Sequence, residues 1–366
     1  MIKECEKCLL NDNIPGIEID ASGLCGFCRH HSLMIANYTY NEEDVLENLA
    51  ALKSRIKKRR KGQYDALLGL SGGVDSSYLA KLAADLDLNI LCIHFDNGWN
   101  SKIAIRNISK IIEKTNFDFI THVINWNEFK DLQRSFFYSG VIDIEMLTDH
   151  AIFASMYRLA RKYKVKTILS GTNFRTEHGM PSAWVWNKMD LKNIKDIHRK
   201  FGSKKIKSFP TLSPYRWLLM KQFGFGANFE EPLNLINYEK ARAIDELKNY
   251  FGWEDYGGKH HESEFTKFYQ TYILPTKFGV DKRTVHLSDL IRNNEITKME
   301  GEKELADIEF PLIDEKLKQY VVKKLGFTEE EFDELMLSEA IPHSNYKTDV
   351  FTINRLKSIR SKIVGR

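Results

Sequence analysis

Residues 64–77 constrain the fold of this 366-residue chain more than any other stretch, because an apolar run there breaks into a glycine-rich turn. The run from Tyr64 to Leu70 has the length of a buried strand, and apolar residues recur at helical spacing from Ser76 onward. Between them, Gly72 and Gly73 carry no side chains, so backbone N–H groups can approach an anion closely. The pattern predicts a strand, an anion-binding loop and a helix in direct succession.

The polar residues of this loop indicate a nucleotide with a divalent cation. Ser71, Ser76 and Ser77 supply hydroxyl donors, whereas the carboxylate of Asp75 repels phosphates unless Mg²⁺ lies between them. The loop lacks the Gly-Lys-Ser/Thr ending of a Walker A sequence, and the alternative is a plain glycine turn capped by serine. Ser71-Gly-Gly-Val-Asp-Ser76 resembles the signature of the PP-loop ATP pyrophosphatases. This resemblance implies cleavage of ATP between its α and β phosphates.

Composition describes an ordinary globular protein, with 43% hydrophobic and 28% charged residues. No apolar run reaches the length of a membrane span, and the amino terminus has no apolar signal region, so we expect a cytoplasmic protein without membrane contact. The formal net charge of +4 is small for this length and argues only weakly for nucleic-acid binding, which we do not expect.

Two C-x2-C pairs lie near the amino terminus, Cys5 with Cys8 and Cys25 with Cys28. This spacing is typical of a tetrahedral zinc site with four thiolate ligands, and such a site has no open position for catalysis. A segment of about thirty residues buries little apolar surface, so zinc would supply most of its folding energy. We therefore predict structural zinc. The alternatives are an iron–sulfur cluster on the same residues and a set of unrelated reduced cysteines.

Residues 42–60 read as an amphipathic helix, and its last part, residues 53–61, is the strongest basic run in the chain. One interpretation is contact with RNA, a nucleotide or an acidic partner. The other, which we favour, is a solvated helix end whose cations complement the helix dipole.

Beyond the loop, predicted strands and helices alternate. The strands cover residues 89–95, 117–123 and 167–170, and the helices cover residues 101–115, 128–137 and 149–163. Such alternation predicts an α/β fold, a parallel sheet wrapped by helices, with ligands at the carboxyl ends of the strands.

Polar groups follow two further strands of this predicted sheet. After the second strand, the backbone near His94 and Phe95 is a candidate contact for adenine, and Asp96 for ribose or metal. The alternative there is a plain Asn-Gly turn. The strand ending at Ser170 leads into three candidate nucleotide ligands, Gly171, Thr172 and Asn173.

Upstream of that strand, Asp149 opens a predicted helix. It is interpreted either as an N-cap or as a residue that faces the nucleotide.

The segment after Asn173 has neither helical nor strand periodicity and is a candidate for binding a second substrate. Its candidate residues are Arg175, Glu177, Trp184 and Trp186, although the Trp rings equally suit lid packing. Farther along, Lys259 and His260 are candidate substrate contacts. Lys277, Lys282 and Arg283 are candidate catalytic cations that neutralise charge on departing pyrophosphate, the alternative being a solvated surface.

These changes of pattern divide the chain into four parts. They are a zinc module at residues 1–35, a linking helix at 36–62, an ATP-binding domain at 63–202 and a mostly helical region at 203–366 that contributes to the active site.

Taken together, these segments resemble the N-acetyl sugar amidotransferase family, PP-loop enzymes of bacterial surface-sugar biosynthesis that include the pseudaminic acid and O-antigen amidotransferases. The resemblance covers nearly the whole chain. It rests on the two cysteine pairs and on residues 70–77, 94–100, 148–152, 169–173, 255–260 and 274–283.

The resemblance implies an adenine nucleotide alpha hydrolase-like fold that uses ATP, Mg²⁺ and structural zinc. It implies adenylation of the acetamido oxygen of an N-acetyl sugar, expected to be nucleotide-linked, followed by attack of ammonia to give an acetamidino group with release of AMP and pyrophosphate. It also implies a separate glutaminase subunit, similar to that of histidine biosynthesis, with a companion barrel subunit. The alternatives are a PP-loop tRNA-modifying enzyme and a nucleotide-binding regulator without catalysis.

Overall fold

A single parallel sheet forms the centre of the protein. The computed structural model describes residues 2–222, 226–258, 261–308, 310–355 and 358. Its five strands lie in the order β3-β2-β1-β4-β5. Leu67 in the central strand pairs with Leu91 on one side and with Ile168 on the other. The strands are β1 (Ala66–Gly69), β2 (Ile90–Asp96), β3 (Asp118–Val123), β4 (Thr167–Leu169) and β5 (Asn228–Glu230). The predicted α/β fold class is confirmed.

Side chains of the central strand alternate between the two faces of the sheet, and helices cover both faces. Successive side chains of a strand point to opposite faces. Leu68 packs in one buried cluster with residues of α3 (Val74–Asp85), α4 (Lys102–Thr115) and α9 (Lys240–Phe251). Leu67 packs in another cluster with residues of α6 (Met146–Lys162). The chain crosses over in opposite directions from β1, so the carboxyl ends of β1 and its neighbours form the switch point where ligands bind in such sheets.

Two sequence-based boundaries differ from the structure. Helix α6 begins at Met146, with Glu145 at its N-cap position, so Asp149 lies in the first turn and the N-cap interpretation of Asp149 was wrong. Strand β5 lies beyond residue 202, where no strand was expected. Strand β5 has only three residues, too few to show the alternation of apolar and polar residues that predicts a strand. For this reason the sequence did not reveal it.

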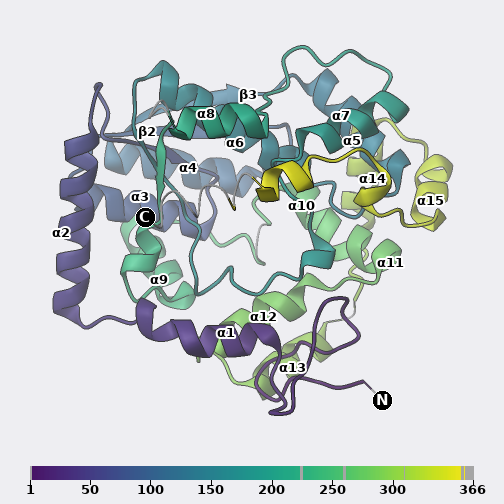
Figure 1. The fold of residues 1–366 in the computed structure, drawn as a ribbon, viewed down its shortest axis with the longest axis horizontal. Helices are drawn as coiled ribbons and strands as arrows, with labels where there is room; N and C mark the ends of the chain where they lie inside the picture. The colour runs from purple at the N-terminus through teal and green to yellow at the C-terminus, as the bar shows by residue number, and fades with distance from the viewer. Residues whose placement is uncertain (1, 223–225, 259–260, 309, 356–357, 359–366) are drawn as a thin grey trace.

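The amino-terminal module packs against the helical carboxyl-terminal region. Figure 1 shows α1 (Gly26–Met34) beside α12 (Lys282–Arg292) and α13 (Lys298–Asp307), near the amino terminus. The backbone N–H of Leu9 donates to Ser288 Oγ at 3.1 Å, and Lys298 Nζ donates to the carbonyl oxygen of Cys5 at 2.9 Å. The module is therefore attached to the helix whose first residue, Lys282, reaches the site described below.

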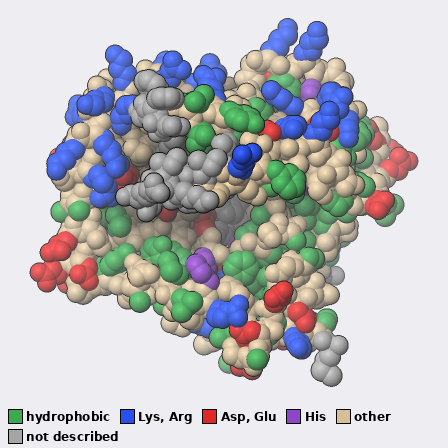
Figure 2. Space-filling view, in the orientation of Figure 1, with side chains coloured by type: hydrophobic (Ala, Val, Ile, Leu, Met, Phe, Trp, Pro, Cys, Tyr) green, Lys and Arg blue, Asp and Glu red, His purple; other side chains and the backbone are tan. Residues whose placement is uncertain are grey.

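The basic end of α2 (Glu42–Arg59) makes ion pairs within the chain. Arg55 and Arg59 both pair with Glu230 of β5, and Lys57 Nζ lies 2.8 Å from the buried carboxylate of Asp65. Figure 2 shows acidic side chains gathered at the start of this helix and basic ones at its end. This distribution complements the helix dipole and favours the structural interpretation of the basic run.

Helices make up most of the remaining described chain, including a π-helical turn at η4. No described helix is long and apolar enough to span a membrane. The remaining elements are η1 (Ile35–Tyr38), α5 (Trp126–Ser139), η2 (Ser182–Trp184), α7 (Leu191–Phe201), α8 (Pro214–Gln222), η3 (Pro232–Leu235), α10 (Glu264–Phe268), η4 (Tyr269–Ile273), α11 (Leu274–Phe278), α14 (Glu315–Leu325), α15 (Glu329–Leu337) and η5 (His343–Asn345).

Candidate active site

The loop between β1 and α3 has a backbone that requires glycine. Gly72 has φ +81°, and a Cβ atom there would lie 2.5 Å from the carbonyl oxygen of Ala104. The carbonyl oxygen of Gly72 accepts hydrogen bonds from Trp253 Nε1 at 3.1 Å and from Asn107 Nδ2 at 3.4 Å. These contacts fix the peptide at the start of α3, where a helix N-terminus favours a bound anion.

A small cavity of about 110 Å³ adjoins this loop and brings two carboxylates together. Asp75 and Glu262 both line it, and Asp75 Oδ1 accepts a hydrogen bond from Tyr238 at 2.5 Å. The carboxylate oxygen Oε1 of Glu262 lies 3.0 Å from the position of a Cβ atom on Gly73. Paired carboxylate oxygens beside a phosphate loop are a donor set that fits Mg²⁺. Lys240 lines the same cavity and contributes positive charge.

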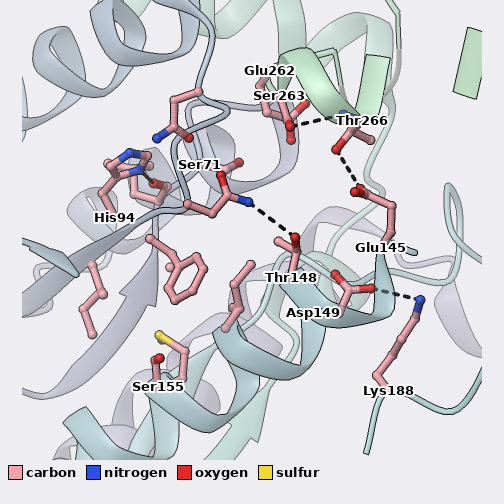
Figure 3. Close-up of a pocket in the computed structure, with 18 of the residues that line it drawn as sticks. Ser71, His94, Glu145, Thr148, Asp149, Ser155, Lys188, Glu262, Ser263 and Thr266 are labelled. Atoms are coloured by element: carbon pink, nitrogen blue, oxygen red, sulfur yellow. Dashed lines mark hydrogen bonds and ion pairs between the residues drawn. The ribbon is translucent and has the colours of Figure 1, made fainter. Parts of the chain in front are cut away.

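A larger cavity of about 420 Å³ continues from Ser71 and Glu262, which line both spaces. At one end lie His94 and Ser155 (Figure 3). His94 Nδ1 lies 3.1 Å from the carbonyl oxygen of Leu70, and burial lowers the pKa of its ring. Within the described chain, His94 Nε2 and Ser155 Oγ are buried without a hydrogen-bond partner. Buried polar atoms normally have partners, so these two fit a ligand that carries polar atoms of its own, such as adenine.

Charged side chains line the opposite end of the main cavity (Figure 3). Lys188 Nζ lies 2.7 Å from Asp143 and 3.1 Å from Asp149. Burial opposes the charge of Lys188, but the two carboxylates outweigh it and raise the pKa of the ammonium group. Burial lowers the pKa of Lys282, with Asp143 acting in the opposite direction. Glu145 completes this end of the cavity, and its carboxylate accepts a hydrogen bond from Thr266 Oγ1 at 2.7 Å.

The structure brings together many of the residues singled out from the sequence. Residues from the predicted ATP site and one predicted catalytic cation line the two cavities; these are Ser71, Gly73, Asp75, Ser76, His94, Phe95, Asp149 and Lys282. Gly171 lies against the loop, because a Cβ atom on it would be 3.2 Å from that of Asp75. The carboxyl end of β4 therefore lies beside the loop that follows β1, at the predicted edge of the sheet.

Other predicted nucleotide ligands have contacts of their own away from the cavities. Asp96 Oδ1 accepts hydrogen bonds from the N–H of Gly98 at 2.8 Å and from Asn100 Nδ2 at 2.9 Å, which is the pattern of the alternative turn. Asn173 is buried and bonded to Thr176, and Thr172 is bonded to Ser170. Ser77 is buried in α3 and lines neither cavity.

The candidate substrate segment after Asn173 mainly holds other parts of the chain together. Arg175 donates to the carbonyl oxygen of Tyr38 at 3.0 Å, and Trp184 is buried in the core. Trp186 stacks on His343 with ring centroids 5.0 Å apart and donates to Asp190. These contacts match the packing alternative for the Trp rings. Glu177 lines a third cavity of about 150 Å³, and Lys259 and His260 lie outside the described residues.

Two predicted catalytic cations do not reach the loop. Lys277 Nζ donates to the carbonyl oxygens of Leu335 and Ser338 at the end of α15. Arg283 pairs with Asp281 at 2.7 Å, and its guanidinium lies 3.9 Å from the ring centroid of Phe310. Neither lines the two cavities beside the loop, so the geometry gives no support to the interpretation of these two as cations that stabilise departing pyrophosphate. Lys240 lines the small cavity beside the loop, and Lys282 lines the main cavity.

Sequence reasoning missed several side chains of the site: Glu145, Ser155, Lys188, Lys240 and Glu262. Each comes from a segment that looked ordinary in the sequence, namely a helix start, a helix interior or an irregular connection. Glu262 lies two residues after His260, a candidate substrate contact, and this closeness in sequence was the one available signal.

The four predicted metal ligands form a buried cluster. The ligand atoms of Cys5, Cys8, Cys25 and Cys28 all lie within 4.8 Å of one another. The Sγ atoms of Cys5 and Cys28 are 3.7 Å apart, as are those of Cys8 and Cys25. Tetrahedral zinc with Zn–S bonds of about 2.3 Å requires S···S distances of about 3.8 Å. The cluster therefore fits a structural metal ion held by four thiolates.

The fold and the site define an α/β protein whose glycine-rich loop lies at the carboxyl edge of a parallel sheet, beside a cavity lined by carboxylates and lysines. Residues 262–360 match the family model described as LPS biosynthesis protein WbpG-like, C-terminal domain. For that part of the chain, the match agrees with the expected place in surface-sugar biosynthesis. No curated protein sequence matches the chain.

Two solved structures are distantly similar in fold. The NMN synthetase from Francisella tularensis is 14% identical, with a TM-score of 0.39, over 80% of this chain and 97% of its own. The NH3-dependent NAD synthetase from Campylobacter jejuni subsp. jejuni NCTC 11168, in complex with the nitrate ion, is 13% identical, with a TM-score of 0.36, over 78% of this chain and 94% of its own. The TM-scores are low, so neither likeness bears on the activity of this chain.

Proposed function

We propose that this protein is an ATP-dependent, AMP-forming amidotransferase that converts the acetamido group of an N-acetyl sugar into an acetamidino group in surface glycan biosynthesis. One observation carries the proposal. The region that matches the LPS biosynthesis model contributes to the wall of the main cavity, which Ser71 of the loop also lines. Its residues there are Glu262, Ser263, Thr266, Gln270 and Lys282. A nucleotide-binding edge and a glycan-biosynthesis domain thus share one cavity.

The chemistry requires activation of the amide before nitrogen is exchanged. An amide oxygen is a poor leaving group, so ammonia does not displace it directly. Attack of that oxygen on the α-phosphate of ATP gives an adenylated imidate and pyrophosphate. Ammonia then expels AMP. Holding both substrates in one cavity converts these steps into reactions between positioned groups.

The cavities provide a place for each part of ATP. In the proposed arrangement, adenine lies by His94 and Ser155, the α-phosphate lies near Ser71, and departing pyrophosphate occupies the small cavity lined by Lys240. Asp75 and Glu262 would hold Mg²⁺ there, which supplies positive charge to the phosphates. The charged end beyond Asp149 is left for the sugar and the nitrogen source.

The nitrogen source is proposed to be ammonia from a separate glutaminase subunit that acts with a companion barrel subunit. The described chain shows no cysteine outside the metal cluster except Cys92, which is buried in β2. A glutaminase nucleophile has to be accessible. We therefore expect ammonium to support turnover by the purified chain, and glutamine to do so only when the partners are added.

Pyrophosphate release tests the proposed function directly. Purified protein is incubated with Mg·ATP and ammonium, together with a panel of UDP- and CMP-linked N-acetyl sugars or with bulk tRNA. We expect release with one sugar and a product in which NH replaces oxygen, measured by mass spectrometry. Release that depends on tRNA alone would establish the tRNA-modifying alternative instead. ATP binding without release under any condition would establish the regulator.

Lys240 provides a second test, because its charge lies beside the phosphate loop. We expect Lys240→Ala to lower sugar-dependent pyrophosphate release about 100-fold, the order found when one stabilising group is removed from a transition state. Lys248→Ala is the matched control, since Lys248 is exposed near the other end of α9. A loss with Lys277→Ala equal to that with Lys240→Ala would contradict the geometric assignment.

A further inference from the structure

Glu145 lies at the charged end of the main cavity, and the adenylation step proposed above does not use it. It lies at the N-cap position of α6 and is half-buried in the cavity wall. Figure 3 shows its carboxylate directed toward Thr266, whose hydroxyl donates to it at 2.7 Å. Thr266 belongs to α10, in the region that matches the LPS biosynthesis model. The carboxylate is therefore oriented by a neutral hydroxyl.

The neighbouring carboxylates differ from Glu145 in their partners. Asp143 is buried and lies 2.7 Å from Lys188 Nζ, and it also accepts hydrogen bonds from the backbone N–H groups of Trp186 at 2.6 Å and Met146 at 3.1 Å. Asp149 lies 3.1 Å from the same ammonium group. An ion pair stabilises a carboxylate in its ionised form and makes it a weak base. Glu145, bonded to a hydroxyl, is the better placed of the three to accept and release a proton.

The groups around Glu145 set its basicity. Burial is the main effect and raises the pKa of Glu145 to about 7, while the hydrogen bond from Thr266 lowers it. The charge of Asp149 raises this pKa, and Lys282 and Lys188 lower it. Tyr269 of η4 also faces this cluster and stays neutral, because burial raises its own pKa. A general base works best when its pKa lies near the operating pH.

We propose that Glu145 is the general base that accepts a proton from ammonia as it attacks the activated sugar, an inference that rests on the proposed function. The imidate formed by attack of the amide oxygen keeps the N–H of the acetamido group and is cationic. The nitrogen lone pair of ammonia forms a C–N bond to the imidate carbon, and the C=N π pair moves to the protonated sugar nitrogen. The ammonium-like nitrogen then loses one proton to Glu145. The remaining lone pairs expel AMP as the C–O bond breaks, which leaves the amidinium product and protonated Glu145.

The charged end of the main cavity adjoins a further space. Lys188 and Lys282 line this end together with Glu145 and Asp149. The third cavity, of about 150 Å³, shares Met180, Gln270 and Lys282 with the main cavity. Ammonia can therefore be supplied on the side of the cavity away from His94, without crossing the adenine end.

The two half-reactions separate this proposal from the proposed function. Sugar-dependent exchange of labelled pyrophosphate into ATP reports adenylation without ammonia, and amidine formation reports the second step. We expect Glu145→Gln to keep exchange close to wild type and to lower amidine formation about 100-fold. Hydroxylamine, a weaker base that is unprotonated at neutral pH, should restore product formation. Glu264→Gln, on α10 but outside the cavities, is the matched control.

Thr266→Val keeps the carboxylate and removes its hydrogen-bond partner. Amidine formation by the wild type should rise with pH through about 7, because the base must be ionised. In Thr266→Val the midpoint of this pH dependence should move to higher pH, because the hydrogen bond that is lost lowers the pKa of Glu145 in the wild type. Amidine formation by Glu145→Gln within threefold of wild type, or a Thr266→Val midpoint that stays in place, would overturn the assignment. Wild-type protein without sugar-dependent exchange would instead overturn the proposed function.

Discussion

Replacing Asp75 by Asn is expected to abolish sugar-dependent pyrophosphate release while leaving the fold intact. Asp75 and Glu262 line the small cavity beside the phosphate loop and are the two carboxylates proposed to hold Mg²⁺. A metal ion supplies several kcal/mol of charge stabilisation in phosphoryl chemistry, so its loss corresponds to a fall of about 1000-fold. The amide of Asn remains able to accept the hydrogen bond from Tyr238, which protects the local structure.

The measurement is pyrophosphate release as a function of Mg²⁺ concentration, with thermal unfolding recorded in parallel. Asp85→Asn is the matched control, because Asp85 is exposed at the far end of the same helix. Glu262→Gln should weaken the dependence on Mg²⁺ in the same direction. Turnover by Asp75→Asn at the wild-type rate and with the same Mg²⁺ dependence would show that the metal is held elsewhere.

The loop and the sheet were predictable because their signals are local. Gly72 and Gly73 stand between an apolar run and a helical period, so strand, turn and helix follow from neighbours in the sequence. The register of β1 with β2 and β4 then places the carboxyl ends of these strands at one edge. Residues at those ends, such as His94 and Gly171, could be named in advance for that reason.

The charged end of the cavity depends on contacts between distant segments. Glu145, Lys188 and Lys282 meet only after α6, the irregular segment before α7 and α12 have packed together. No spacing in the sequence encodes that meeting, so Glu145 and Lys188 were missed. For the same reason, the sequence could not separate Lys282, which lines the cavity, from Lys277 and Arg283, which do not. Residues close in sequence contact different neighbours once helices α11 and α12 form.

The cysteine pairs were predictable from spacing alone, but their setting was not. Arg292 of α12 is almost fully buried. Its guanidinium lies 6.0 Å from the ring centroid of Phe27, which stands in the sequence between the two cysteines of the second pair. Burial opposes the charge of Arg292, but Asp289 and then Cys8 and Cys28 raise its pKa. Four thiolates around Zn²⁺ carry a net charge of about −2, which a buried guanidinium partly balances.

Removal of the metal is therefore expected to destabilise more than the amino-terminal module. Cys25→Ser should abolish zinc binding and lower the free energy of unfolding by at least about 3 kcal/mol, because metal binding supplies folding energy and because unpaired charge would remain around Arg292. The module is bonded to Ser288 and Lys298, so α12 should loosen and Lys282 should lose its place in the cavity. Sugar-dependent turnover should fall together with stability.

Metal content by mass spectrometry and thermal unfolding measure these two effects. Cys92→Ala is the matched control, because Cys92 is a buried cysteine of β2 outside the cluster, and its substitution should leave the zinc content at one ion per chain. Iron with visible absorbance in the wild-type protein would favour the iron–sulfur alternative on the same four residues. A metal-free wild type that unfolds at the same temperature as Cys25→Ser would show that the cysteines are unrelated to metal binding. Because the S···S distances fit tetrahedral zinc, we expect neither result.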